Sequence, residues 1–248
     1  MGRIDRDEIK RIAEQIRAEN PEKRVAYERH LAASKPILDE LARLGYDIES
    51  LDDLRHQGKP WKTAVPILVR WLPEVSDTEV KENIVRALSV PWVGDEATAE
   101  LIEEFKKYAP IVPQQHEDLS DFSSGQLIKR LQTAENRNPS SSLAWTIGNA
   151  LSIVDVKGFE RQIIDLCRNT RYGTARQMLV LGLSRLRNSE AEEAALELLD
   201  DDDVKLHAIG ALGKMKAKKA LLQLERVLTD KRAAIRKEAR KAITKIMR

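Results

Sequence analysis

The sequence predicts an all-α fold, a right-handed α-solenoid (superhelix) of about five helical repeats with an N-terminal helical cap. Two observations lead to this expectation. Of the 248 residues, 33% are charged and 4% are aromatic, and the helix-favouring residues Ala, Leu, Glu, Lys and Arg are abundant. In addition, an apolar pattern with helical spacing recurs at intervals of about thirty residues, which is typical of repeat proteins.

The recurring pattern places apolar residues at relative positions 0, 4, 7, 8 and 11. It begins at residues 80, 143, 175, 204 and 235, and the first interval is about twice as long as the others. This spacing forms one apolar stripe along an α-helix, so we expect the five helices to pack through it. Small residues occupy position 7 and would let neighbouring helices approach closely: Ala87, Ala150, Gly182, Ala211 and Ala242.

Each stripe follows another helical pattern, so every repeat is predicted to contain a first and a second helix. The first helices are expected over residues 64–72, 96–105, 159–166, 191–199 and 220–228. Pro66 suits a first helical turn, where the missing N–H costs nothing. Polar turns join the two helices, and we expect Asp residues there, such as Asp200 to Asp203, to cap the helix that follows.

Two segments carry a resemblance to a known family. The first segment has Leu198-Leu199-Asp200 followed by Val204-Lys205 and Ala208, and the second has Val227-Leu228 followed by Ile235-Arg236 and Ala239. Both segments resemble HEAT repeats of the short bacterial, PBS-lyase-type form. The resemblance is strong over 143–248 and good over 61–108, and it implies a solenoid fold but little about function. It also implies a ladder of ion pairs between repeats, made by Asp77, Asp203 and Asp230 with Lys81, Arg176, Lys205 and Arg236.

The remaining segments suggest how the chain is organised. Helices are expected over 9–18 and 25–44, where Pro36 would kink or split the second and Gly45 would end it. An extra helix over 126–134 would interrupt the repeats. The predicted parts are an N-terminal helical cap (1–60), HEAT-like repeats (61–108), an insertion (109–140), and HEAT-like repeats with a basic C-terminal cap (141–248).

Solenoids of paired helices present one helix of each pair on a concave groove. Because the stripe is used for packing, positions 2, 3, 6 and 10 of the second helices should point into this groove, Thr146 among them. The candidate partner-binding residues are Asn83, Arg86, Trp145, Asn149, Gln177, Met178, Leu181 and His207. Exposed Trp and Met are typical interface anchors, although both could instead pack between repeats. The leading hypothesis is a non-catalytic scaffold that binds a peptide or a partner helix.

The charge of the chain is distributed unevenly. Residues 204–248 hold 14 Lys and Arg against 3 Asp and Glu, a net +11, whereas the rest holds 28 against 37, a net −9. This basic end suggests an alternative, nucleic-acid binding, although solvated capping helices would have the same composition. The residues expected to contact phosphates are Lys214, Lys237, Lys241 and Lys245.

No catalytic constellation is evident, so we expect no enzyme activity, no metal and no cofactor. The four histidines lack zinc-ligand spacing, His116-Glu117 is an isolated pair, and no phosphate-binding glycine motif occurs. An alkylpurine DNA glycosylase-like activity is the least favoured reading, because no Asp faces the groove in this register. The single cysteine, Cys167, lies on an apolar helix face and is expected in the core.

Targeting signals are also absent from the sequence. The first residues lack the apolar region of a signal peptide, and no apolar run is long enough to span a bilayer. We therefore expect a cytoplasmic protein with no membrane partner.

Overall fold

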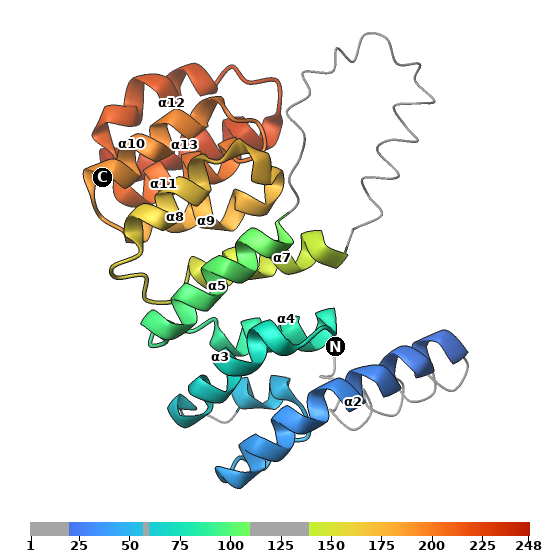
Figure 1. The fold of residues 1–248 in the computed structure, drawn as a ribbon. Coiled ribbons are helices and arrows are strands. Elements are labelled where there is room, and N and C mark those ends of the chain that lie inside the picture. The colour runs from blue at the N-terminus through green and yellow to red at the C-terminus, as the bar shows by residue number, and fades with distance from the viewer. Residues whose placement is uncertain (1–19, 57–59, 110–138) are drawn as a thin grey trace, which may run out of the picture. The chain divides into compact units, whose positions relative to one another are not determined.

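A computed structural model describes residues 20–56, 60–109 and 139–248 (Figure 1). All regular secondary structure within these ranges is helical. The chain divides into two compact units, Met1–Ile84 and Val85–Arg248, and the division falls inside a helix of the predicted 61–108 repeats. The helices expected over 9–18 and 126–134, and the His116-Glu117 pair, lie outside the described residues.

The first unit begins with α2 (Pro21–Arg43), whose N-terminus is capped by Asn20. The helix ends as predicted at Gly45, which has φ +84° and donates its N–H to the Ala42 carbonyl, while Tyr46 donates to the Leu41 carbonyl. Of the two outcomes expected at Pro36, a kink or a split, the split is wrong, because α2 continues through Pro36. Pro36 and the preceding turn at Ala32 are exposed, so water can satisfy the carbonyl that loses its donor.

After α2, the first unit contains two 3₁₀ helices, η1 (Leu51–His56) and η2 (Lys62–Ala64), and then α3 (Val65–Glu74) and the start of α4 (Thr78–Leu88). Pro66 lies in the first turn of α3, as predicted. Asp77 caps α4 as expected, because its Oδ1 accepts hydrogen bonds from the N–H groups of Glu79 and Val80, both at 3.1 Å. The helix pair α3–α4 is thus joined by a turn whose carboxylate organises the second helix.

The second unit repeats this pairing. Its first helices are α5 (Asp95–Tyr108), α8 (Glu160–Arg168), α10 (Ser189–Glu197, extended by η6, Leu198–Asp200) and α12 (Leu221–Val227, preceded by η7, Lys218–Ala220). Its second helices are α7 (Pro139–Leu151), α9 (Gln177–Gly182, between η4, Thr170–Arg176, and η5, Leu183–Arg185), α11 (Lys205–Met215) and α13 (Ala233–Met247). The segment 110–138 therefore falls between the two helices of the α5–α7 pair.

Consecutive second helices pack side by side, since α7 contacts α9, α9 contacts α11, and α11 contacts α13 (Figure 1). Small residues make this possible, as predicted. A Cβ on Gly182 would lie 2.8 Å from Ser152 Cβ, and a Cβ on Gly213 would lie 2.8 Å from Ala242 Cα. The second helices therefore form one layer of the unit, at distances that larger side chains would not allow.

The apolar stripe is confirmed as the packing surface of the second helices. In the frames that start at 143 and 204, for example, Leu143, Ile147, Val204 and Ala208 are completely buried. Pro91, at the end of the first frame, is exposed. Cys167 is buried on the inner face of α8, and burial strongly raises the pKa of its thiol, so the cysteine is a core residue as predicted.

Candidate interaction surface

The solvent-exposed side of α7, α9, α11 and α13, here called the second-helix surface, carries most of the predicted partner-binding residues. Trp145 on α7 and Leu206 on α11 are large apolar side chains that stay 42% and 37% exposed. Met178 and Leu181 on α9, the helix between them, are half-buried. The expectation for Thr146 is wrong, because this residue is only 4% exposed and its side chain belongs to the packing of α7.

Two polar residues of this surface serve the fold as well. Gln177 Nε2 donates to the Asp203 carbonyl at 3.1 Å, which ties α9 to the turn before α11. Arg185 Nη1 donates to the Ser152 carbonyl at 2.6 Å and so reaches the end of α7. Gln177 and Arg185 are positions 2 and 10 of the frame that starts at 175, which were expected to point into the groove. The sequence did not indicate that each also connects neighbouring helix pairs.

His207 and Asn149 are both half-buried on the second-helix surface. The Nδ1 atom of His207 is buried and has no hydrogen-bond partner among the described residues. Burial lowers the pKa of His207 and so favours the neutral form of the imidazole. A neutral ring adds no charge to this part of the surface.

The centre of the surface has a position without a side chain. Gly210 on α11 lies between Leu181 of α9 and Glu238 of α13, and a Cβ there would lie 3.2 Å from Leu181 Cδ1 and 3.9 Å from Glu238 Oε1. The glycine thus has an apolar group on one side and a carboxylate on the other. The surface changes from apolar to charged at this helix.

The lysines predicted to contact phosphates are all exposed, Lys214 on α11 and Lys237, Lys241 and Lys245 on α13. Lys241 Nζ lies 3.0 Å from Glu238 Oε2. The other three form no ion pair with the residues that the structure describes. Their charges are therefore available to a ligand.

The two candidates on α4 lie in different units, Asn83 in the first and Arg86 in the second. Asn83 lines a hollow of about 190 Å³ within the first unit, together with Tyr27 and His30 of α2 and Asp53 of η1. Arg86 is exposed. The structure therefore groups Asn83 with α2 and η1.

The ladder of ion pairs that the resemblance implies exists in an altered form. Lys205 Nζ lies 3.8 Å from Asp230 Oδ2, as predicted. Arg176, however, pairs more closely with Asp201, at 2.7 Å, than with Asp203, at 4.0 Å. The reason lies in the turn, where Asp201 Oδ1 accepts the Asp203 N–H at 3.0 Å and this holds the Asp201 carboxylate beside Arg176.

The other positions of the ladder also differ from the expectation. Arg236 Nη1 donates to two backbone carbonyls, those of Asp230 at 2.7 Å and Lys231 at 2.9 Å. Lys81 is completely buried and donates to the Leu72 carbonyl, in the last turn of α3. A basic side chain at this place therefore serves the end of the preceding helix, where the dipole favours a positive charge.

Asp77 also departs from the implied ladder. Its carboxylate receives a hydrogen bond from Arg29 Nε of α2 at 3.1 Å, and His30 Nδ1 lies 3.6 Å away. Burial alone would raise the pKa of Asp77, but the hydrogen bonds from the Val80 N–H and from Arg29 outweigh it and the pKa is lowered. Sequence reasoning missed this contact because Arg29 lies 48 residues away in the sequence.

Sequence reasoning also missed Arg232. Its guanidinium bridges Asp202 at 2.8 Å and Asp230 at 2.9 Å. Arg232 lowers the pKa of Asp230, and Lys205 together with Arg232 lowers the pKa of Asp202. The prediction that Asp200 to Asp203 cap α11 is wrong, because the cap residue of that helix is Val204 and no side chain caps its first turn. The Asp cluster instead provides partners for bases of neighbouring repeats.

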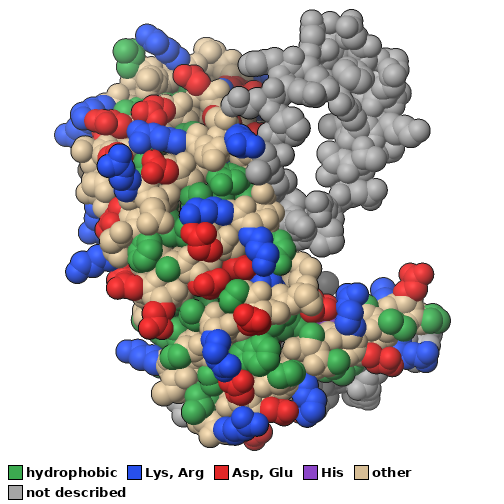
Figure 2. All heavy atoms as spheres, in the orientation of Figure 1, with side chains coloured by type: hydrophobic (Ala, Val, Ile, Leu, Met, Phe, Trp, Pro, Cys, Tyr) green, Lys and Arg blue, Asp and Glu red, His purple; other side chains and the backbone are tan. Residues whose placement is uncertain are grey.

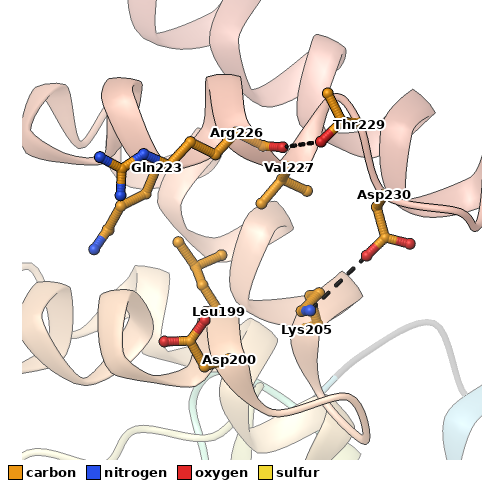
Figure 3. Close-up of a pocket in the computed structure, with 8 residues that line it drawn as sticks. All are labelled: Leu199, Asp200, Lys205, Gln223, Arg226, Val227, Thr229 and Asp230. Carbon is orange, nitrogen blue, oxygen red and sulfur yellow. Dashed lines mark hydrogen bonds and ion pairs between the residues drawn. The ribbon is translucent and has the colours of Figure 1, made fainter.

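The space between α10 and α12 contains a hollow of about 350 Å³ (Figure 3). Gln223, Arg226 and Val227 of α12 form one wall, Leu199 of η6 forms the other, and the Lys205–Asp230 pair closes one end. Nothing in the sequence pattern marked this hollow, because its walls come from separate repeats.

Three further properties concern metal ligands, membrane-spanning helices and surface charge. Within the described ranges, no group of three or more His, Cys, Asp and Glu side chains is arranged to hold a metal ion. No helix described by the structure combines the length and the apolar character that crossing a membrane requires. Acidic and basic side chains are interspersed over the face that Figure 2 shows.

Comparison with known families supports the repeats independently. Residues 160–244 match the family model for HEAT repeats, and this range runs from α8 into α13. The match covers the last three helix pairs, which share their order of first and second helix with α5–α7 and α3–α4. The chain has no significant match among curated proteins.

Proposed function

We propose that this protein is a non-catalytic, cytoplasmic interaction scaffold, a right-handed α-solenoid of about five HEAT-like repeats that binds a peptide or a partner helix on its second helices. The exposure of Trp145 and Leu206 on one layer of helices carries the proposal. Large apolar side chains that stay exposed beside half-buried ones are typical of protein interfaces. The HEAT-repeat match supports it, since such repeats commonly serve as interaction scaffolds.

In this proposal, different residues of the second-helix surface have different roles. Trp145, Met178 and Leu181 would be the apolar anchors, because aromatic and Met side chains bury large area at low entropic cost. Asn149, Gln177 and His207 would supply polar contacts at the edge of these anchors. Arg86, which is exposed and belongs to the same unit as these helices, would supply a charged contact.

The proposal can be tested with peptides selected from a displayed random library on the immobilised full chain. We expect the selected peptides to lose about tenfold or more in affinity on a Trp145→Ala/Met178→Ala double variant, because anchor residues dominate interface energies. Fluorescence anisotropy measures the affinity, and circular dichroism confirms that the variant is folded. A folded double variant that kept full affinity would overturn the proposal.

A matched control separates a specific loss from a general effect of removing apolar side chains. Leu222 is 62% exposed on α12, a first helix, and does not belong to the second-helix surface. Leu222→Ala should leave the affinity of the same peptides unchanged.

Nucleic-acid binding is the second candidate function, and the exposed lysines of α11 and α13 favour it. It predicts that a labelled random duplex or single strand binds the chain with an affinity that falls steeply as salt rises. This binding should be lost in a Lys237→Glu/Lys241→Glu variant. No binding at low salt would exclude this candidate and the glycosylase-like reading together.

A further inference from the structure

The charges of the second helices change in one direction along the layer. Helices α7 and α9 contain no Asp, Glu, Lys or Arg, whereas α11 contains two lysines. Helix α13 contains five basic residues and one acidic residue. Arg185, next to α9, is hydrogen-bonded to the Ser152 carbonyl at the end of α7. Apart from this residue, and because the four helices contact one another in this order, the second-helix surface passes from uncharged to basic over three helix-to-helix contacts.

Not every basic residue at the charged end is available to a ligand. Lys205 is held by Asp202 at 3.2 Å and by Asp230, and Arg236 is hydrogen-bonded to backbone carbonyls. The lysines that remain on the solvent side of α13 are Lys237, Lys241 and Lys245, of which only Lys241 has a carboxylate beside it within the described part of the chain. They lie at intervals of four residues, on one face of the helix.

We infer that the partner of the second-helix surface is a protein segment with an apolar anchor at one end and acidic residues at the other. This inference rests on the proposed function and adds the chemistry of the occupant. The apolar part would lie over Trp145 and Leu206, and the carboxylates would lie over the three lysines of α13. Like charges spaced along one helix face repel one another, and bound carboxylates relieve that repulsion.

The geometry also sets the distance between the two parts of the segment. Packed helices lie about 8 to 10 Å apart, so three steps from α7 to α13 span about 24 to 30 Å. An extended chain covers about 3.3 Å per residue, which places the acidic residues about seven to nine positions from the residue bound at Trp145. The anchor and the acidic stretch thus fit within one short segment.

A nucleic acid fits this surface less well than an acidic protein segment. A phosphate backbone requires positive charge along its whole path, but α7 and α9 offer none. The apolar half of the surface would be left without a contact.

The peptides selected on the wild-type chain test this inference by their composition and by their response to charge reversal. We expect Asp and Glu to be enriched about seven to nine positions from an aromatic or aliphatic residue. Their affinity should fall about tenfold or more on a Lys237→Glu/Lys241→Glu/Lys245→Glu variant, and the loss should diminish at high salt.

A second triple variant provides a control with the same change in net charge. Lys216, Lys218 and Lys219 are exposed and lie between α11 and α12, outside the second-helix surface. Lys216→Glu/Lys218→Glu/Lys219→Glu should reduce the affinity less than twofold, and equal losses on both triple variants would overturn the inference by showing only a general charge effect.

The remaining outcomes separate this inference from the proposed function. Peptides that require Trp145, show no acidic bias and bind the α13 variant unchanged would overturn the inference and leave the proposed function intact. Peptides that bind equally well without Trp145 and Met178 would overturn the proposed function itself. A random duplex that binds through the α13 lysines would assign them to nucleic acid and also overturn the inference.

Discussion

The two junctions between the last three helix pairs use the same kinds of charged residue in different surroundings. At the first junction, Arg176 is completely buried and donates to the Cys167 carbonyl at 2.9 Å, the Gly173 carbonyl at 3.0 Å and Asp201 at 2.7 Å. At the second, Arg232 shares Asp202 and Asp230 with Lys205 near solvent. Burial, not the number of ion pairs, should decide how much each junction depends on its charges.

The largest effect is expected at the first junction. Arg176→Ala would remove the guanidinium partner of Asp201 and the side-chain donor to the Cys167 and Gly173 carbonyls. We expect a loss of about 3 to 5 kcal/mol in the free energy of unfolding, measured by urea denaturation. If Arg176→Ala lowered the free energy of unfolding no more than Arg232→Ala does, burial would not distinguish the two junctions.

Cys167 offers a second measurement at the same junction. Its thiol is buried and its pKa is raised, so a thiol reagent should react with the native protein only when this region opens. Arg176→Ala should increase the rate of that reaction. Unchanged labelling would show that Arg176 does not hold the α8 end closed.

The second-largest effect tests whether the second junction depends on packing. A Cβ at position 213 would meet Ala242 Cα, a backbone atom, at 2.8 Å, so Gly213→Ala should cost about 1 to 3 kcal/mol. Gly210→Ala, three residues earlier on the same helix, would meet only the end of the Leu181 side chain at 3.2 Å. That variant should be neutral or slightly stabilising, because Ala favours helix over Gly. Equal unfolding midpoints for the two variants would contradict this.

The next effect is small and concerns the exposed network of the second junction. Arg232→Ala should lower stability only slightly, because water and salt screen the two ion pairs that it removes. The difference from wild type should disappear in concentrated salt. A loss of stability that persists in concentrated salt would contradict this expectation and show that Arg232, like Arg176, stabilises the fold through contacts that salt does not screen.

The smallest effect is a contrast in pH dependence between two neighbouring aspartates. The pKa of Asp230 is lowered by Arg232, so its contribution to stability is present above the unfolded pKa of about 4 and is lost as the pH falls below it. The pKa of Asp203 is raised by partial desolvation and by the neighbouring Asp201 carboxylate, so its ionisation opposes folding at neutral pH.

Asn substitutions at these two positions measure the contrast. At pH 7, Asp230→Asn should lower the unfolding midpoint and Asp203→Asn should raise it. Both differences from wild type should shrink as the pH falls below about 4, where the carboxyl groups become protonated in the unfolded chain. Shifts of the same sign at pH 7 would show that the electrostatic surroundings of the two residues do not differ in this way.

Much of the fold could be predicted from the sequence because it depends on local patterns. The apolar stripes, the first helices, the end of α2 at Gly45 and the burial of Cys167 follow from helical spacing and residue type. Residue partners in the turns could not be predicted. Arg176 pairs with Asp201 rather than Asp203 because of a hydrogen bond inside the turn. Thr146 is buried although its position in the repeat pattern suggested exposure.

For the candidate surface too, the local pattern could be predicted from the sequence and the contacts between repeats could not. Helical spacing alone indicated that Trp145, Gln177 and Leu206 lie away from the apolar stripe, and the structure leaves each of them at least partly accessible. The sequence did not indicate that Gln177 would also bind the Asp203 carbonyl or that Gly210 would lie between Leu181 and Glu238. These contacts join residues about 25 to 30 positions apart, so they depend on how successive repeats stack.

By itself, the sequence determined that this protein is helical, which stripe of the second helices is buried, and how charge changes from α7 to α13. These properties depend on the spacing and type of residues along one helix, which the chain encodes directly. Only the tertiary structure decided which charges are buried, which carboxylate pairs with which base, and where two helices touch through a glycine. Those outcomes depend on distances between segments that are remote in sequence, and the packing of whole helices fixes such distances.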